Sequence, residues 1–223
     1  MKVLVACEYS GIVRDEFIKQ GHDAVSCDLL PSESNVGEHY QGDVTDILYD
    51  GWDMLIAHPP CTYLSVSGAR WYYHPQDKEL PYEERRPHPS HPNRRQLQQD
   101  ALDFVQLLLD APINKIVLEN PISVISTRIK KPTQIIHPYE YGHPTSKSTC
   151  LWLKNLPPLK STNIVDPIWV NISKGKRMSK FHYDAYGLPP SERWKVRSAT
   201  FPGIAQAMAK QWGPKTKIKK ESK

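Results

Sequence analysis

Two side chains in this sequence are of the types that covalent chemistry on a heterocyclic ring needs. Cys61 follows two prolines after the apolar segment 53–57, and Glu119 follows the apolar segment 115–118. A thiolate can add to carbon 6 of an electron-poor pyrimidine while a carboxyl group protonates or hydrogen-bonds ring nitrogen 3. The addition makes carbon 5 nucleophilic enough to accept a methyl group from a sulfonium donor. Cys61 and Glu119 are therefore predicted to be catalytic, with Asn120 holding Glu119 in place.

Both residues also have an ordinary structural interpretation. Most cysteines are small buried hydrophobic residues, and Glu119-Asn120-Pro121 could merely turn the chain. Against this, Pro59 and Pro60 restrict the backbone and favour a stiff exit that presents Cys61 at the end of a strand. Glu119 ends another strand of the same predicted sheet, so the two functional interpretations support each other.

The elements that must position these residues alternate between strands and helices. Strands are predicted over 2–6, 24–27, 42–44, 53–57 and 115–118, and helices over 12–20, 97–109 and 204–212. This alternation indicates an α/β fold with a mostly parallel sheet, right-handed crossovers and helices on both faces. Ligands bind at the carboxyl ends of strands in such sheets, so Cys61 and Glu119 are expected to face one crevice.

Acidic residues at the strand ends suggest a nucleotide-type cofactor. Glu8 lies in the first βα turn, Asp28 ends the second strand and Asp43 ends the third element. Gly11 is the one glycine of the first turn, so the dinucleotide fingerprint is absent and a nicotinamide cofactor is disfavoured. A cofactor without a pyrophosphate, such as S-adenosylmethionine, tolerates such a turn. Each acid taken alone could instead be a cap or a solvated charge.

Length and composition narrow the class of protein. A chain of 223 residues with 39% hydrophobic content fits one domain with one core. It has no apolar run of the ~18–20 residues that a membrane span needs and no signal-peptide pattern, so a cytoplasmic protein is expected. The four cysteines contain no CxxC pair, which disfavours a metal site and fits reduced thiols. The net charge of +5 permits a polyanionic partner.

The residues around Cys61 and Glu119 resemble the motifs of a known family. His58-Pro59-Pro60-Cys61-Thr62 looks like the Pro-Pro-Cys-Gln nucleophile motif of DNA (cytosine-5) methyltransferases, and Glu119-Asn120-Pro121 looks like their Glu-Asn-Val motif. The order of the motifs along the chain also agrees. The resemblance covers most of residues 2–213 and is closer still to short methyltransferase-like proteins of bacteriophages, which would place the protein in the host cytoplasm.

The resemblance implies a Rossmann-like S-adenosylmethionine-dependent methyltransferase fold with a reduced target-recognition region. It implies transfer of a methyl or related group from S-adenosylmethionine, or a modified analogue, to carbon 5 of cytosine in DNA through a covalent adduct with Cys61. Asp28 would bind ribose hydroxyls, Asp43 the adenine amino group, and the turn 7–11 the methionine part. The predicted cofactor-binding set is Cys7, Glu8, Tyr9, Ser10, Gly11, Asp28, Leu29, Asp43, Val44, His58 and Pro60.

Two long segments break the alternation of strands and helices. Residues 66–95 are predicted to form a substrate loop, and 122–195 a small recognition region. Both belong to one expected domain over 1–213. A disordered basic tail is expected to follow it over 214–223. Arginines anchor phosphates and aromatic rings stack on splayed bases, although a solvated loop is the alternative. The predicted DNA-binding residues are Arg70, Trp71, Arg85, Arg86, Arg94, Arg95 and Lys147.

Departures from the family pattern keep other interpretations open. Thr62 replaces the usual glutamine, Pro121 replaces valine, and no Arg-x-Arg pair is evident, so Lys147 or Arg128 would have to substitute for it. One alternative is an amino-methyltransferase acting on N4 of cytosine or N6 of adenine, whose Asp/Asn-Pro-Pro-Tyr motif shares only the two prolines. Another is a non-catalytic DNA-binding protein on the same fold. The sequence leaves monomer and homodimer open.

Overall fold

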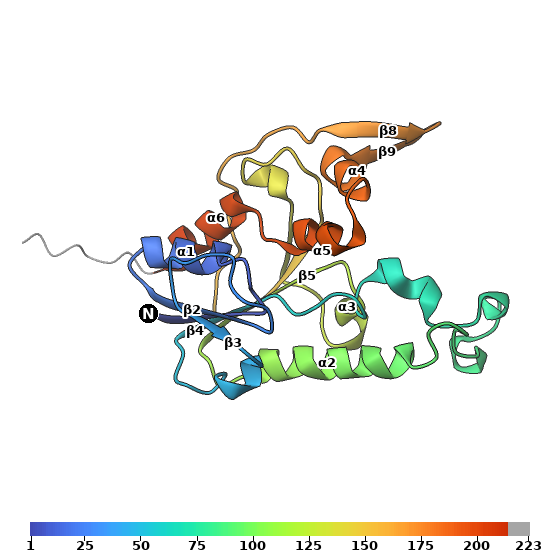
Figure 1. The fold of residues 1–223 in the computed structure, drawn as a ribbon, viewed down its shortest axis with the longest axis horizontal. Coiled ribbons are helices and arrows are strands. Elements are labelled where there is room, and N and C mark those ends of the chain that lie inside the picture. The colour runs from blue at the N-terminus through green and yellow to red at the C-terminus, as the bar shows by residue number, and fades with distance from the viewer. Residues whose placement is uncertain (214–223) are drawn as a thin grey trace, which may run out of the picture.

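The computed structural model describes residues 1–213, and a seven-stranded sheet forms its centre (Figure 1). The strand order across the sheet is β3-β2-β1-β4-β5-β7-β6. β1 to β5 pair in parallel, whereas β7 runs antiparallel to both β5 and β6. The strands are β1 (Lys2–Ala6), β2 (Asp23–Asp28), β3 (His39–Gln41), β4 (Met54–Ala57), β5 (Lys115–Pro121), β6 (Gln134–Ile136) and β7 (Thr149–Lys154).

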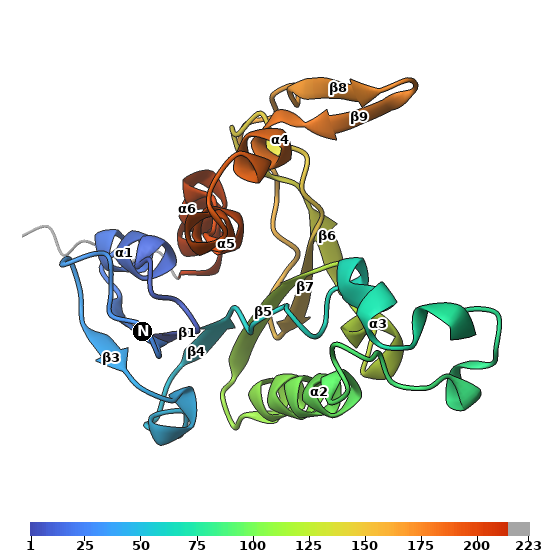
Figure 2. The same cartoon turned by 45° about the vertical axis from the view of Figure 1, so that its right-hand side comes forward.

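Helices cover both faces of this sheet. On one face α1 (Ile12–Lys19) packs against α6 (Pro202–Trp212), and both join one apolar cluster with the sheet. On the other face lies the long helix α2 (Arg94–Asp110), which buries Leu102, Val105 and Leu108 at helical spacing (Figures 1 and 2). The predicted α/β, Rossmann-like fold with a mostly parallel sheet and helices on both faces is confirmed.

The central strands contain continuous apolar runs because helices cover both faces of the sheet. In β1, Val3 and Val5 belong to the cluster under α1 and α6, while Leu4 and Ala6 belong to the cluster under α2. Alternate side chains of a strand point to opposite faces, so a strand covered on both faces needs apolar residues at every position. This explains why β1 and β4 read as unbroken apolar segments.

Two strand boundaries differ from the sequence-based prediction. The third strand lies at His39–Gln41, and the predicted strand 42–44 is wrong, because Val44–Asp46 forms the 3₁₀ helix η1. Asp43 caps η1, since its carboxylate accepts hydrogen bonds from the N–H and the hydroxyl of Thr45 at 2.9 and 2.8 Å. β5 continues as far as Pro121, so Glu119 and Asn120 lie near its carboxyl end, where β7 pairs with them and β4 has already ended.

The carboxyl-terminal half contains helices that the sequence pattern did not predict. It holds α3 (Ile125–Arg128), the hairpin of β8 (Trp169–Ser173) and β9 (Lys176–Ser179), α4 (Lys180–Tyr186) and α5 (Pro190–Ser198). α5 buries none of its residues, so it lacks the apolar periodicity that marks a helix in sequence. The β8–β9 hairpin projects from the sheet at the top of Figure 2, and residues 66–93 project separately at the right.

Residues 66–93 form a folded loop built on three short 3₁₀ helices. These are η2 (Val66–Trp71), η3 (Pro75–Asp77) and η4 (Tyr82–Glu84), and α2 begins at Arg94, inside the predicted substrate loop 66–95. The predicted tail over 214–223 lies outside the described residues. Within residues 1–213, no helix combines the length and apolar character needed to cross a membrane.

Candidate active site

A cleft of about 1170 Å³ opens where β1, β4 and β5 end. Its walls come from the β1–α1 turn, the segments that follow β4 and β5, the segment before β7, the β8–β9 hairpin and α5. Cys61 and Glu119 both line this cleft, as expected of residues at the carboxyl ends of neighbouring parallel strands. The predicted site residues that line it are Cys7, Glu8, Tyr9, Ser10, Asp28, His58, Pro60, Cys61, Trp71, Arg94, Glu119, Asn120 and Lys147.

The remaining predicted site residues do not line this cleft, and their roles stay predictions. Gly11 begins α1 with φ of 74°, and a Cβ there would lie 2.6 Å from the guanidinium of Arg14, so glycine is needed for the turn. Asp43 caps η1. The predicted residues outside the cleft lining are Gly11, Leu29, Asp43, Val44, Arg70, Arg85, Arg86 and Arg95.

Hydrogen bonds join the Cys61 segment to the end of β5. The Cys61 carbonyl accepts the Leu64 N–H at 3.1 Å, which closes a tight turn behind the prolines. The buried Asn120 donates from Nδ2 to the Pro59 carbonyl at 2.9 Å, and the Val124 N–H donates to the Leu64 carbonyl at 2.9 Å. These hydrogen bonds therefore fix the segment that carries Cys61 against the end of the strand that carries Glu119.

The Cys61 sulfur faces the cleft as a thiol at neutral pH. Cys61 is exposed at the cleft surface, but the protein atoms around it partly desolvate the sulfur, and this effect and the nearby Glu119 carboxylate raise the pKa of Cys61. The positive charges of Lys147 and Arg197 act in the opposite direction. An added positive charge beside the sulfur would lower the pKa of Cys61 and so increase the fraction of thiolate.

Glu119 forms a partly buried pair with His58. The Nδ1 atom of His58 lies 3.1 Å from Oε2 of Glu119. Burial disfavours the charged form of each group, but their mutual hydrogen bond and attraction outweigh it. The pKa of His58 is consequently raised and the pKa of Glu119 lowered, and both shifts favour the imidazolium–carboxylate form of the pair.

The turn between β1 and α1 is fixed by Glu8. Its buried carboxylate accepts the N–H groups of Val13 at 2.7 Å and Arg14 at 3.2 Å, so it caps α1 from inside the protein. Burial raises the pKa of Glu8, and the charge of His58 opposes this shift. Cys7 has φ of 58°, an uncommon conformation for a residue other than glycine. The hydrogen bonds of Glu8 thus fix the conformation of this turn, which forms one wall of the cleft.

The part of the cleft beside β2 fits a nucleoside-type ligand. Asp28 ends β2 and lines the cleft with Tyr9 and Leu30, which places a carboxylate next to an aromatic and an apolar side chain.

Within residues 1–213, His58 Nε2 and Asn120 Oδ1 are buried without a hydrogen-bond partner. Buried polar atoms are normally satisfied, so these two invite a polar ligand. In the same part of the chain, no three His, Cys, Asp or Glu side chains are arranged to hold a metal ion.

Besides Trp71 and Arg94, a further group of basic and aromatic residues lines the cleft, and the sequence did not predict it. It consists of Trp169 and Arg177 from the β8–β9 hairpin and Arg193, Trp194 and Arg197 from α5. The guanidinium of Arg177 lies 4.5 Å from the ring centroid of Trp169. Residues 169–180 contain four basic residues and no acidic one, and this charge pattern could have identified the hairpin.

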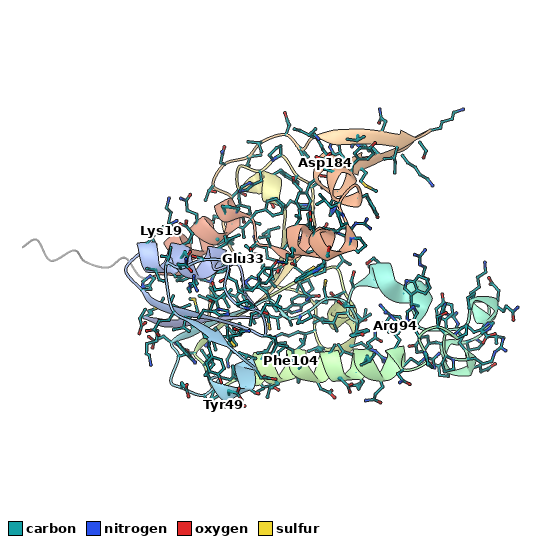
Figure 3. The ribbon with its side chains drawn as sticks, viewed as in Figure 1. Lys19, Glu33, Tyr49, Arg94, Phe104 and Asp184 are labelled. Atoms are coloured by element: carbon teal, nitrogen blue, oxygen red, sulfur yellow. The ribbon has the colours of Figure 1, made fainter. Side chains whose placement is uncertain are left out.

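Several of the predicted DNA-binding arginines are engaged inside their own loop. Arg86 forms a forked pair with Asp77, with Nη2 to Oδ1 at 2.6 Å and Nε to Oδ2 at 2.9 Å. Arg85 and Arg95 donate to backbone carbonyls of the same loop. Arg94 lies at the amino end of α2, where the helix meets the loop, and lines the cleft (Figure 3). Arg94 also donates to the Thr62 carbonyl at 2.9 Å, so all four of these arginines have hydrogen-bond partners within the protein.

Comparisons with known proteins give only distant structural likenesses. No protein-family model matches the chain, and no curated protein sequence matches it. One similar solved structure is a predicted DNA modification methyltransferase encoded within an E. coli prophage, with 16% identity, a TM-score of 0.43, and coverage of 85% of this chain and 56% of the other. Another is a mutant of Spodoptera frugiperda DNMT2, with 14% identity, a TM-score of 0.36, and coverage of 77% and 56%. The chain thus spans about half the length of these structures, and likenesses this distant say nothing of its activity.

Proposed function

We propose that this chain is an S-adenosylmethionine-dependent DNA (cytosine-5) methyltransferase. One observation carries the proposal: the Cys61 thiol and the Glu119 carboxyl group, far apart in the sequence, line one cleft at the ends of neighbouring strands. The Asn120–Pro59 hydrogen bond ties their segments together. A nucleophile and a carboxyl group in a common cleft are the two groups that activation of a pyrimidine requires.

The proposed reaction begins when the Cys61 thiolate bonds to carbon 6 of cytosine. Glu119 in its acid form hydrogen-bonds ring nitrogen 3, which draws electron density from the ring and stabilises the adduct. Carbon 5 then uses its electron pair to bond the methyl group, whose bond to the donor sulfur breaks with the bonding pair left on that sulfur. The proton on carbon 5 leaves to solvent, its electron pair forms the C5–C6 double bond, and the C6–S bond breaks with its pair returning to sulfur. The target base must be unstacked to reach the sulfur.

The cofactor is assigned to the part of the cleft around Asp28. S-adenosylmethionine, or a modified analogue, supplies an electrophilic group on a positively charged sulfonium. The Asp28 carboxylate can accept hydrogen bonds from ribose hydroxyls, as an acid after the second strand does in nucleotide-binding sheets. Tyr9 and Leu30 offer surfaces for the adenine ring, and the turn at Cys7–Gly11 borders the methionine part.

The Asp28→Ala variant should bind S-adenosylmethionine roughly 10- to 100-fold more weakly than the parent. This range corresponds to loss of a charge-assisted hydrogen bond worth about 1.5–3 kcal/mol. Isothermal titration calorimetry on the full chain measures it. The matched control is Asp46→Ala, because Asp46 accepts a hydrogen bond from Tyr40 and does not line the cleft. Equal affinity in the Asp28 and Asp46 variants would argue against this cofactor position.

DNA is the proposed partner, held between two basic walls. Arg94 and Trp71 border the cleft on the side of the loop 66–93, and Trp169 and Arg177 border it from the hairpin. Arginine side chains contact phosphates, and indole rings can stack on an unstacked base. The short recognition region 122–195 predicts weak sequence specificity, a very short recognition site or a partner that supplies specificity.

The Arg177→Ala variant should weaken DNA binding uniformly across sequences and reduce the slope of log K against log salt by about 1. Fluorescence anisotropy at several salt concentrations provides the slope. Arg85→Ala is the control, since Arg85 donates to the Leu80 and Lys78 carbonyls of its own loop and does not line the cleft. An unchanged slope for Arg177→Ala would remove the hairpin from the proposed DNA surface.

The experiment that tests the proposed function is covalent trapping. DNA containing 5-fluorocytosine should form a stable adduct with the chain in the presence of S-adenosylmethionine, because fluorine at carbon 5 blocks the final elimination. Denaturing electrophoresis and peptide mass spectrometry would locate the adduct on Cys61. A chain that binds S-adenosylmethionine and DNA but forms no adduct would contradict cytosine-5 chemistry.

A further inference from the structure

We propose that His58 is a positioning residue that stores the proton which Glu119 presents to ring nitrogen 3. The inference rests on the proposed function and assigns a role to a contact at that same site. His58 extends β4 by one residue, with its N–H donating to the Ala6 carbonyl at 2.9 Å. Its Nδ1 lies 3.1 Å from Glu119 Oε2. The imidazole therefore sits directly behind the carboxyl group that the reaction needs in its acid form.

The pairing of the partly buried Glu119 carboxylate with a cation poses a chemical problem for the proposed reaction. Within the pair, the hydrogen bond and charge of His58 lower the pKa of Glu119, so the carboxylate of the pair carries no proton of its own to donate. The same interaction raises the pKa of His58, so the proton remains in the pair. The pair thus holds one transferable proton, which resides on His58 next to the carboxylate.

The charged groups around His58 favour this storage. Glu119 faces the imidazole from β5 and Glu8 from the β1–α1 turn, and both favour the protonated ring. Lys147, from the segment before β7, opposes them. Cys61 lies three residues further along the segment of His58 and faces the same cleft. Two carboxylates against one lysine leave the surroundings of His58 net negative.

The proton transfer balances without an outside acid. When ring nitrogen 3 approaches Glu119, the Nδ1–H bond of His58 breaks, its electron pair stays on the imidazole, and the carboxylate takes the proton. Glu119 then donates that proton to nitrogen 3 as the Cys61 sulfur bonds to carbon 6. When the C6–S bond breaks, nitrogen 3 returns the proton by the same route. His58 ends each cycle protonated.

The pair also fixes the geometry of Glu119, so positioning and proton storage must be separated by the choice of variant. In His58→Asn, the amide nitrogen can occupy the place of Nδ1 and donate to Glu119, but it carries no transferable proton. In His58→Ala, both the contact and the proton are lost. A purely structural role predicts that asparagine restores activity relative to alanine, whereas proton storage predicts that it does not.

The test measures the rate of adduct formation on 5-fluorocytosine DNA between pH 5 and 9, using the full chain with S-adenosylmethionine. His58→Asn should react about 100-fold more slowly than the parent, within the range typical of a positioned acid. The loss of rate should persist at saturating S-adenosylmethionine, which separates proton storage from the cofactor contact that the sequence predicts for His58. A large loss of cofactor affinity with an unchanged saturated rate would overturn the inference and make His58 a cofactor ligand.

The pH profile gives a second readout that a structural role would not move. The reaction needs the thiolate and the stored proton together, so the rate rises with pH as the thiolate fraction grows and levels off once the pair loses its proton. The levelling point should lie above pH 6.5 in the parent, because the pKa of His58 is raised from that value. In His58→Asn the levelling point should differ from that of the parent, because it then follows the pKa of Glu119, which burial raises once the imidazolium is gone.

Nitrogen-15 NMR of the His58 ring tests the pair without any reaction. The imidazole should titrate above pH 6.5 in the parent and below it in Glu119→Gln, since burial then outweighs the remaining attraction. Absence of an adduct in the parent would defeat the proposed function, and this inference with it. A parent that reacts, together with a His58→Asn variant of equal rate and profile, would defeat the inference alone.

Discussion

Replacing Cys61 by serine is expected to abolish carbon-5 modification of cytosine, with a rate loss of about 10⁴-fold or more. A serine hydroxyl is not ionised near neutral pH, and removal of a nucleophile costs several orders of magnitude in enzymes that form covalent adducts. Mass spectrometry of nucleosides from cells that express the chain measures the product, and its mass identifies the transferred group. The Cys61→Ser chain should still bind S-adenosylmethionine.

Cys150→Ala is the matched control for the loss of a thiol. Cys150 lies on β7, is fully buried, and does not line the cleft, so this variant should keep its activity as long as it folds. N4-methylcytosine or N6-methyladenine that persists in the Cys61→Ser chain would instead identify an amino-methyltransferase. Unmodified DNA from the parent, despite binding of cofactor and DNA, would favour the non-catalytic alternative.

Arg14→Met should destabilise the protein by about 3–5 kcal/mol, as does removal of one partner from a buried ionic network. The Arg14 side chain is fully buried and donates to the Asp15 carboxylate at 2.8 Å, the Ser26 hydroxyl at 2.9 Å, and the carbonyls of Ser34 and Glu38 at 3.2 and 3.3 Å. Methionine fills similar space but leaves these acceptors without a donor. Urea denaturation followed by circular dichroism gives the loss of unfolding free energy.

Lys19→Ala provides the control on the same helix. Lys19 pairs with Glu16 at 2.7 Å on the surface of α1, and its side chain is 61% exposed (Figure 3). Exposed pairs contribute little to stability, so its urea midpoint should match that of the parent. A parental midpoint for Arg14→Met as well would show that water replaces the guanidinium at this site.

The parts of the fold that the sequence predicted are those with strong periodicity. Apolar runs identified β1, β4 and β5, and the apolar spacing over 97–109 identified α2, although the structure buries Leu102 and exposes Leu97. The third strand was misplaced because β3 has three residues and none of them is buried. The helix α5 escaped detection for a similar reason, since its residues face solvent or the cleft rather than an apolar core.

The candidate site was predictable where local sequence carries its chemistry. Cys61, Glu119 and Asp28 stand at strand ends, and the rules for parallel sheets bring such positions together. The His58–Glu119 contact was not predictable, because it depends on how two neighbouring strands align their last residues. The wall formed by Trp169 and Arg177 was also missed, since no local pattern shows that a distant hairpin faces the cleft.

The antiparallel pairing of β5 with β7 has a consequence during synthesis of the chain. β5 needs β7 on one side, yet β7 begins at Thr149 and emerges from the ribosome well after β5 is complete. Until then Ile116, Val117 and Leu118 form an apolar strand with an open edge, which can pair with another chain. A nascent or truncated chain that stops before β7 is therefore expected to depend on chaperones, and it should aggregate when they are scarce.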